Sequence, residues 1–333
     1  MNIWFNHWFS TAYHLINLMR ETNENICIIG TNSNKDCVYK LVCDEWYNEP
    51  QATDINSYVE KCLDFCTEHK IDVFVPHHNL KAICENSSRF QEIGIRLLAN
   101  TDKNDIDTIN NKVKTYDFLN KNGLSDIIPK YFSCRKITEF EKAVLSLQAE
   151  GYKVCFKMAV DEGGISYHVI EENSENSIRC SSSSHVNFRN SMKMIENYNF
   201  SVPLLVMPYL SQPEISVDCL KTDNGILMIP RYKLGGRVSE IKFDEQIMNI
   251  TKRISEKFSL EMPYNIQYRF YESKLQLLEI NLRMSGGLQL SCKGSGINLP
   301  SLALQKLLNN PFEWHYPDFK SRKVAHIEIP VII

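Results

Sequence analysis

Polar side chains recur at period-two spacing near the carboxyl end of the sequence. Glu279, Asn281 and Arg283 alternate with the apolar Ile280 and Leu282. Because successive side chains of a β-strand point to opposite faces, the three polar residues share one face. Carboxylate and amide oxygens are ligands for Mg²⁺, and a guanidinium binds phosphate oxygens. The spacing therefore predicts a strand that holds a metal ion beside an anionic ligand.

A second strand, expected over residues 264–270, pairs with the strand over residues 275–282 through a turn at 272–274. If the apex is at Ser273, Gln267 lies opposite Glu279 and Arg269 lies opposite Leu277. Gln267, Glu279 and Asn281 are then the predicted metal ligands. The alternative is a solvated sheet face whose polar residues share no purpose.

The segments Asn-Ile-Gln at 265–267 and Glu-Ile-Asn-Leu-Arg-Met-Ser-Gly-Gly at 279–287 resemble the magnesium hairpin of the ATP-grasp superfamily. The resemblance is to the branch similar to the large subunit of carbamoyl phosphate synthase, and it extends over nearly the whole chain. It implies that the hairpin binds Mg²⁺, with Mn²⁺ as an alternative, and that Arg283 stabilises the transferred phosphoryl group. The proline that usually follows the asparagine is Leu282 here.

The resemblance also implies a set of residues that bind the phosphates of ATP. Lys112 begins the segment that matches the family's entry helix, and Lys157 matches its second basic residue. Gly163 and Gly164 match the glycine-rich cover over the phosphates. The family's proline after the second lysine is Met158 here, and acidic residues at 161 and 162 enter the loop. Those two carboxylates need a cation or an orientation away from the phosphates.

Residues 205–218 resemble the segment in which the family holds adenine. Backbone groups of Met207, Tyr209 and Leu210 are expected at the edge of the base, and Glu214 is expected to accept a hydrogen bond from the adenine or ribose side. The alternative for the apolar Val206 and Met207 is an ordinary place in the core.

A basic stretch at residues 231–237 contains three cations next to two glycines. A mobile basic loop suits phosphoryl transfer, because negative charge accumulates in the transition state. Lys233 and Arg237 are the predicted catalytic cations, together with Arg283. The alternative is a solvated loop without a chemical role.

The elements that must position these residues divide the chain into three parts. Strands and helices alternate over residues 1–98, which predicts an α/β domain with a doubly wound parallel sheet. A small ATP-grasp subdomain with a linker helix is expected over 99–202, and a large, mostly antiparallel subdomain over 203–333. The linker helix is expected at 108–120. The two ATP-grasp subdomains are α+β and are expected to clamp the nucleotide.

Three histidines follow expected strands of the first domain. His7, His77 and His78 stand where parallel sheets place their ligand crevice, and either face a substrate there or lie in ordinary surface loops. The first strand-to-helix turn contains no glycine, so we expect this domain not to bind a dinucleotide.

Composition excludes several classes of function. The formal net charge of -3 disfavours a nucleic-acid binder. No run reaches the roughly 18 apolar residues that span a bilayer, and the first residues lack a signal-peptide pattern. The 11 cysteines form no CxxC pair and are expected to be reduced, mostly buried thiols. Cys62 and Cys66, one turn apart, suit an amphipathic helix better than a metal site. We expect a cytoplasmic protein.

The resemblance implies an ATP-dependent ligase that forms a C–N bond. ATP activates a carboxylate as an acyl phosphate, and an amine then attacks it. The partners implied are ATP, a small carboxylate and an amine, with neither nucleic acid nor membrane, and with a homodimer as an option. The acceptor is expected between the N-terminal sheet and the turn at 285–287. The alternatives are an ATP-grasp kinase or carboxylase, and a catalytically silent nucleotide-binding or regulatory protein.

Overall fold

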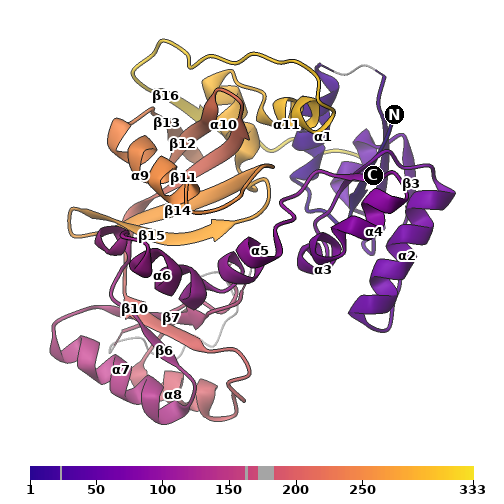
Figure 1. The fold of residues 1–333 in the computed structure, drawn as a ribbon. Helices are drawn as coiled ribbons and strands as arrows, with labels where there is room; N and C mark the ends of the chain where they lie inside the picture. Colours follow the sequence, from indigo (N-terminus) through magenta and orange to yellow (C-terminus); the bar gives the residue numbers. More distant parts are fainter. Residues whose placement is uncertain (23–24, 162–163, 172–183) are drawn as a thin grey trace. The chain divides into compact units, whose positions relative to one another are not determined.

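The computed structural model describes residues 1–22, 25–161, 164–171 and 184–333 (Figure 1). Its contacts divide the chain into two compact units. Unit 1 comprises residues 1–106, 215–266 and 280–333, and unit 2 comprises residues 107–214 and 267–279. The division by contacts differs from the three consecutive subdomains expected from the sequence, whose boundaries remain a prediction.

The first sheet lies wholly in unit 1. It is formed by β1 (Asn2–Asn6), β2 (Cys27–Asn32), β3 (Glu45–Asn48), β4 (Val73–Val75) and β5 (Arg96–Leu97). All four pairings are parallel and the strand order is β3-β2-β1-β4-β5. The order reverses between β1 and β4, which is where open α/β sheets form their ligand crevice. The predicted doubly wound parallel sheet is therefore confirmed.

Helices and short turns connect these strands. They are α1 (Ala12–Arg20), the 3₁₀ turn η1 (Val38–Val42), α2 (Ile55–Glu68), α3 (Leu80–Glu85) and α4 (Ser87–Glu92). Helix α2 begins at the Asp54 capping box, in which Asp54 accepts a hydrogen bond from Ser57 N at 2.9 Å. Cys62 and Cys66 lie on its buried face, as an amphipathic pattern predicts.

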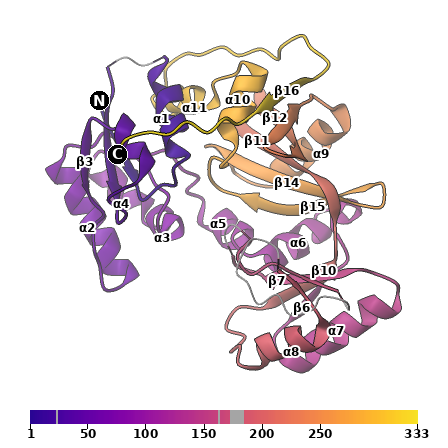
Figure 2. The same ribbon diagram turned by 180° about the vertical axis from the view of Figure 1, so that it is seen from behind.

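The second sheet lies in unit 2. It contains β6 (Phe132–Cys134), β7 (Val154–Met158), β8 (His168–Ile170), β9 (Ser184–Val186) and β10 (Leu204–Pro208), in the order β6-β10-β7-β8-β9. Helices α7 (Ile137–Ala149) and α8 (Phe188–Glu196) cover one face and bury a core that includes Phe140, Phe156 and Val206 (Figure 2).

The third sheet has the order β15-β14-β11-β12-β13-β16. Its strands are β11 (Ser211–Thr222), β12 (Gly225–Gly235), β13 (Val238–Ile241), β14 (Tyr264–Tyr271), β15 (Lys274–Asn281) and β16 (Arg322–Ala325). Helices α9 (Glu245–Ser255), α10 (Leu288–Ser295) and α11 (Leu299–Leu307) belong to the same part of the chain. Within unit 1, α1 packs beside α10 and α11, and one core joins residues such as Leu15, Met19 and Leu304.

The linker differs from the single helix predicted over 108–120. The structure has α5 (Lys103–Ile109) and α6 (Lys112–Lys121), followed by the short η2 (Ser125–Ile127). Asn111 is extended, at φ -119° and ψ 108°, and its side chain accepts hydrogen bonds from the amides of Val113 and Lys114. The prediction was wrong here because asparagine is a strong N-cap, which starts a new helix inside a helix-like pattern.

No helix among the described residues is long and apolar enough to cross a membrane. The described cysteines are free thiols and most of them are buried, as predicted. Within the same residues, no group of three or more His, Cys, Asp and Glu side chains is arranged to hold a metal ion. Cys62 and Cys66 are buried in the core.

Candidate functional site

Lys112 is held at the start of α6 in unit 2. Its backbone amide donates to Ala159 O at 2.9 Å, and its Nζ donates to Asp161 O at 2.9 Å. The residue is only 7% exposed. Its ammonium also lies 3.5 Å from the Glu279 carboxylate. The N-cap at Asn111 therefore brings Lys112 to a fixed place between the loop after β7 and strand β15.

Lys157 lies near the end of β7 in the same unit and is 5% exposed. Its Nζ donates to Leu278 O at 3.4 Å. Burial lowers the pKa of Lys157 to about 8, and nearby Lys112 and Arg269 act in the same direction, whereas Glu279 opposes them. A cation that has been removed from water and lacks enough counter-charge favours an anionic ligand.

The β14–β15 hairpin contributes the Glu279 carboxylate that lies near Lys112 and Lys157. The two strands are hydrogen-bonded neighbours, as predicted, and Tyr116 OH from α6 donates to the carbonyls of Leu277 and Leu278 at 3.0 and 2.8 Å. These bonds fix the strand next to α6. Glu279 is consequently set near both Lys112 and Lys157.

The turn of this hairpin occupies residues 272 and 273, between the last residue of β14 and the first of β15. Pairing continued without interruption from there would put Leu278, and not Glu279, opposite Gln267. The predicted pairing of Gln267 with Glu279 therefore requires a β-bulge in the hairpin and stays a prediction.

Arg269 is a site residue that the sequence reasoning missed. Its Nη2 and Nε donate to Glu214 Oε2 at 2.8 and 3.2 Å, and Glu214 is 7% exposed. Glu214 was predicted to face the adenine or ribose, and the structure shows that one of its oxygens binds Arg269. Because alternate side chains of a strand share a face, Arg269 lies on the same face of β14 as Gln267, and this spacing could have indicated that Arg269 belongs to the candidate site.

Strand β10, the predicted adenine segment, runs between β6 and β7. Leu205 pairs with Lys157, and Met207 pairs with Cys155. Directly paired residues of antiparallel strands share a face, so Met207 lies on the face of Lys157, away from the core that contains Val206. Met207 is 1% exposed and Leu210 is 2% exposed.

Tyr209 does not offer its amide to a base in this structure. The Tyr209 N–H donates to Lys153 O at 2.7 Å, and the Lys153 ammonium lies 4.8 Å from the centre of the Tyr209 ring. Any contact of residue 209 with adenine therefore has to use its carbonyl or its ring.

The loop after β7 contains the two glycines predicted to cover the phosphates. Gly163 lies outside the described residues, and Gly164 is exposed with φ +69°. Asp161 accepts hydrogen bonds from Ser166 N and Oγ at 3.0 and 2.6 Å, and Ser166 Oγ accepts one from Met158 N at 2.9 Å. The Asp161 carboxylate is thus bound by Ser166, which agrees with an orientation away from the phosphates, and Glu162, the second acidic residue of the prediction, lies outside the described residues.

The basic stretch at 231–237 is a β-hairpin rather than a loop. Lys233 pairs with Ser239 between β12 and β13, with a register shift before Gly235. Arg237 stands at the tip with φ +67°, and its guanidinium contacts Glu328 Oε1 at 2.6 Å. The predicted loop is confined to the turn at the tip, because Gly235, at φ +84°, supplies the left-handed conformation that a tight hairpin turn needs, and its mobility stays a prediction.

Arg231, rather than Lys233 or Arg237, is the buried cation of this stretch, at 4% exposure. Its Nε and Nη2 donate to Ser291 Oγ and Ser216 Oγ, both at 3.2 Å. Ser291 Oγ donates in turn to Asp218 Oδ2 at 2.6 Å. A Cβ at Gly287 would lie 2.4 Å from Arg231 Nη2, so a larger residue there would require the Arg231 guanidinium to move.

The three histidines gather at the carboxyl edge of the first sheet. The rings of His7 and His78 lie 5.0 Å apart, and His77 packs against Trp8 at 4.8 Å. Burial lowers the pKa of His77 to about 3, and the Arg283 cation adds to the shift. His77 Nε2 is buried without a hydrogen-bond partner among the described residues.

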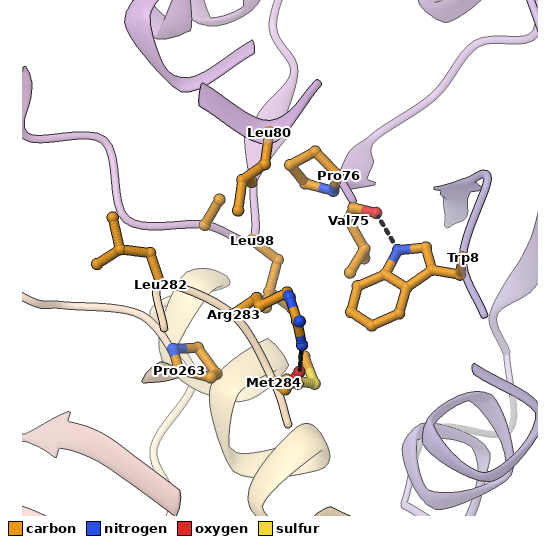
Figure 3. Close-up of a pocket in the computed structure, with 10 residues that line it drawn as sticks. Trp8, Val75, Pro76, Leu80, Leu98, Pro263, Leu282, Arg283 and Met284 are labelled. Carbon is orange, nitrogen blue, oxygen red and sulfur yellow. Dashed lines mark hydrogen bonds between the residues drawn. The ribbon is translucent and has the colours of Figure 1, made fainter. Parts of the chain in front are cut away.

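Arg283 and the end of β15 lie in unit 1, where Arg283 borders a small pocket (Figure 3). Arg283 Nη1 donates to Met284 O at 3.3 Å, and Trp8 Nε1 donates to Val75 O at 2.8 Å in the wall of the pocket. Asn281 is the last residue of β15. The structure thus places Asn281 and Arg283 in unit 1, and Lys112, Lys157, Glu214, Gln267 and Glu279 in unit 2.

Sequence comparisons show which proteins the chain is similar to. Residues 200–330 match a family described as "ATP-grasp in the biosynthetic pathway with Ter operon". The arginine-specific carbamoyl phosphate synthase large chain of Halalkalibacterium halodurans is 21% identical over 89% of this chain and 27% of its own length. The large chain of Sulfurisphaera tokodaii is 23% identical over 75% of this chain and 24% of its own. The chain thus spans about a quarter of these relatives.

Solved structures share the fold. The biotin carboxylase domain of Hydrogenobacter thermophilus 2-oxoglutarate carboxylase, solved with MgADP and bicarbonate, has a TM-score of 0.69 at 14% identity, over 96% of this chain and 72% of that one. N5-carboxyaminoimidazole synthetase from Staphylococcus aureus has a TM-score of 0.65 at 13% identity, over 94% and 78% of the two chains. At such identities the likeness shows the fold alone.

Proposed function

We propose that this chain, an ATP-grasp protein similar in sequence to the carbamoyl phosphate synthase large chain, is an ATP- and Mg²⁺-dependent ligase. It activates a carboxylate as an acyl phosphate and joins it to an amine. The observation that carries the proposal is the meeting of Lys112, Lys157 and Glu279 within unit 2. They come from α6, β7 and β15, which are far apart in the sequence.

The residues of unit 2 fit a nucleotide with a divalent cation. Lys112, Lys157 and Arg269 carry three positive charges, whereas Glu214 and Glu279 carry two negative ones. The lowered pKa of Lys157 means that its charged form lacks compensation, which an anionic phosphate chain supplies. Glu279 is a hard oxygen ligand of the kind that Mg²⁺ prefers.

In the proposed complex, Lys112 and Lys157 hold the phosphates of ATP. Gln267, Glu279 and Asn281 hold Mg²⁺, with Mn²⁺ as a second candidate. The face of β10 that carries Met207 holds the adenine, together with Tyr209, Leu210 and Glu214. Gly163 and Gly164 belong to the cover over the phosphates. The bound cation would neutralise phosphate charge.

Arg283 is proposed to orient the carboxylate and to offset the charge that develops on the transferred phosphoryl group. Lys233 and Arg237 are proposed to assist as further cations of the β12–β13 hairpin. The Arg237 guanidinium must leave Glu328 to do so, because the two are 2.6 Å apart. Catalysis then rests on positioning and charge, without a covalent enzyme intermediate.

The test is release of ADP and phosphate from Mg-ATP in the presence of paired carboxylates and amines. We expect ADP release that depends on both co-substrates and on Mg²⁺, and that stops when the cation is chelated. Glu279→Ala should abolish it, whereas Glu313→Ala, at an exposed glutamate, should not. Full Mg-dependent activity in Glu279→Ala would refute the metal assignment, and tight ATP binding without turnover on any pair would favour a silent nucleotide-binding protein.

Two further expectations belong to the proposal. The enzyme is placed in the cytoplasm, where ATP and its metabolite substrates are found. A homodimer is also proposed, and the biotin carboxylase domain with the same fold is described as a dimer. Light scattering on the purified chain tests the second expectation.

A further inference from the structure

An ion pair between Arg269 and Glu214 joins two strands within unit 2. Arg269 lies on β14 and Glu214 on β11, which are hydrogen-bonded neighbours in the third sheet. Arg269 Nη2 and Nε donate to Glu214 Oε2 at 2.8 and 3.2 Å, and the two side chains are 18% and 9% exposed. Ser211 Oγ donates to Phe270 O at 3.1 Å and fixes the strands beside the pair. The pair is therefore buried and held in one geometry.

This ion pair lies beside the residues proposed to face the nucleotide. Burial lowers the pKa of Lys157 to about 8, and the Arg269 cation adds to that shift. Burial raises the pKa of Cys155 and of Tyr167, and in both cases Arg269 acts against the rise. Cys155 and Lys157 share one face of β7, because alternate side chains of a strand point the same way. The Arg269 guanidinium is thus close to the face of β7 that carries Lys157.

Arg269 and Lys157 differ in how well their charges are compensated. Burial acts against the charged form of Arg269, yet the Glu214 carboxylate raises its pKa above the ordinary value. Lys157 has no comparable partner, because Glu279 does not offset its burial. Separating a buried ion pair leaves an uncompensated charge, which is costly. Lys157 is therefore suited to attract phosphate, whereas Arg269 stays with Glu214.

Glu214 can accept further hydrogen bonds while it is paired. An ionised carboxylate only accepts, and it offers about four acceptor positions. Arg269 uses two of them, both at Oε2. A nucleotide presents two neighbouring hydroxyl donors on its ribose, whereas the edge of the base is proposed to meet backbone groups of residues 207–210. A carboxylate held in a fixed orientation matches the pair of hydroxyls.

We propose that Arg269 is a positioning residue that holds the Glu214 carboxylate as the acceptor for the ribose hydroxyls, so that the ion pair makes the site selective for ribonucleotides. The inference rests on the proposed nucleotide site and assigns Arg269 a role there that is distinct from phosphate binding. Arg269 acts through Glu214 and does not itself contact the nucleotide.

Calorimetric binding of ATP and of 2′,3′-dideoxyATP, each with Mg²⁺, tests the inference. The wild type should bind ATP about tenfold or more tighter than the dideoxy analogue, because a site built to hydrogen-bond a hydroxyl rejects a ligand that lacks it. Glu214→Gln and Arg269→Leu should each reduce this ratio to less than about threefold, since each removes the positioned carboxylate. Arg269→Lys keeps the charge and should restore part of the ratio.

A double substitution distinguishes positioning from independent binding. Arg269→Leu combined with Glu214→Gln should lower the ratio no further than either change alone, because both act through one contact. Arg135→Leu removes the same charge at an exposed position of unit 2 and should leave the ratio unchanged. Thermal unfolding verifies that each variant is folded, and the double variant has no unpaired carboxylate at position 214 to destabilise it.

The outcomes separate this inference from the proposed function. If Arg269→Leu weakens both nucleotides equally and keeps the wild-type ratio, Arg269 acts on the phosphates or on stability and the inference is wrong. A wild type that binds both nucleotides equally, but prefers ATP to inosine triphosphate through Glu214, would place Glu214 at the adenine amino group and overturn the ribose assignment. Failure of the wild type to bind any of these nucleotides would refute the proposed function itself.

Discussion

Lys157 is the residue whose chemistry the environment changes most clearly. Its pKa is lowered to about 8 by burial, so its proton is lost near pH 8. We predict that affinity for Mg-ATP falls as the pH rises from 7 to 9, because the neutral amine no longer attracts phosphate. Calorimetry across this range measures the effect. Lys157→Met should weaken binding at every pH, and Lys157→Arg should bind with little dependence on pH, since arginine keeps its proton.

The lowered pKa of Lys157 also predicts how the free energy of unfolding changes with pH. The folded chain loses the Lys157 proton near pH 8, whereas the unfolded chain keeps it to about 10.5. Between these values the unfolded state binds more protons, so the Lys157 contribution to the free energy of unfolding increases with pH. The free energy of unfolding of the wild type minus that of Lys157→Met should therefore increase between pH 7.5 and 9.5, and urea denaturation at both values measures it. A difference that decreases at the higher pH would contradict the burial of a charged lysine.

Sequence reasoning found some of these residues and missed others for a physical reason. Lys112 and Lys157 were predicted because the segments around them resemble those of the family, and the structure places both near Glu279 while their role towards ATP stays a prediction. Arg269 was missed because its partner Glu214 is distant in the sequence and lies on another strand. Lys233 and Arg237 were preferred to Arg231 because their spacing resembles that of the family, whereas the burial of Arg231 depends on a partner in α10, Ser291. Residues defined by partners from remote strands cannot be identified from spacing alone.

At the scale of elements, the Asn111 N-cap connects helix formation to the nucleotide site. Asn111 accepts hydrogen bonds from Val113 N at 3.0 Å and Lys114 N at 3.2 Å, at the start of the helix that carries Lys112. Asn111→Ala should cost about 1 kcal/mol of stability and also weaken ATP binding, because Lys112 loses its fixed position. Asn187→Ala, at the N-cap of α8, should lower stability by a similar amount without changing ATP affinity. Equal effects of both substitutions on ATP binding would argue against this role for α6.

The turn before α10 offers a matched pair of glycines. A Cβ at Gly287 would lie 2.4 Å from Arg231 Nη2 and 2.5 Å from its Cζ, whereas one at Gly286 meets nothing within 4 Å. Gly287→Ala should therefore lower the free energy of unfolding by about 1–3 kcal/mol, as overpacking does in a filled core. Gly286→Ala should change it by less than about 0.5 kcal/mol. Urea denaturation compares the two, and similar losses would show that the approach of Arg231 does not require glycine at 287.

Elements differed in how well the sequence predicted them. The parallel strands of the first sheet were predicted because each is a short apolar run between helices. The single helix predicted at 108–120 is two helices, and most of the loop predicted at 231–237 is strand, since the Asn111 cap and the glycine turn at 235–236 override the surrounding pattern. In both cases one residue type decides where an element begins or ends.

At the scale of the whole chain, the residues proposed to bind Mg-ATP come from both units. Lys112, Lys157 and Glu279 belong to unit 2, whereas Asn281 and Arg283 belong to unit 1. A ligand that binds only the folded state stabilises it by about 2.7 kcal/mol at one hundred times its dissociation constant. Mg-ATP should therefore protect segments of both units if the proposed residues hold it.

Hydrogen exchange measures this directly. We predict that Mg-ATP slows exchange in β7 and β10 of unit 2 and in residues 281–284 of unit 1. Glu279→Ala should remove the protection in both units, because the metal loses its carboxylate ligand. Glu313→Ala, at an exposed glutamate, should retain it. Protection confined to unit 2 would show that Asn281 and Arg283 take no part in binding Mg-ATP.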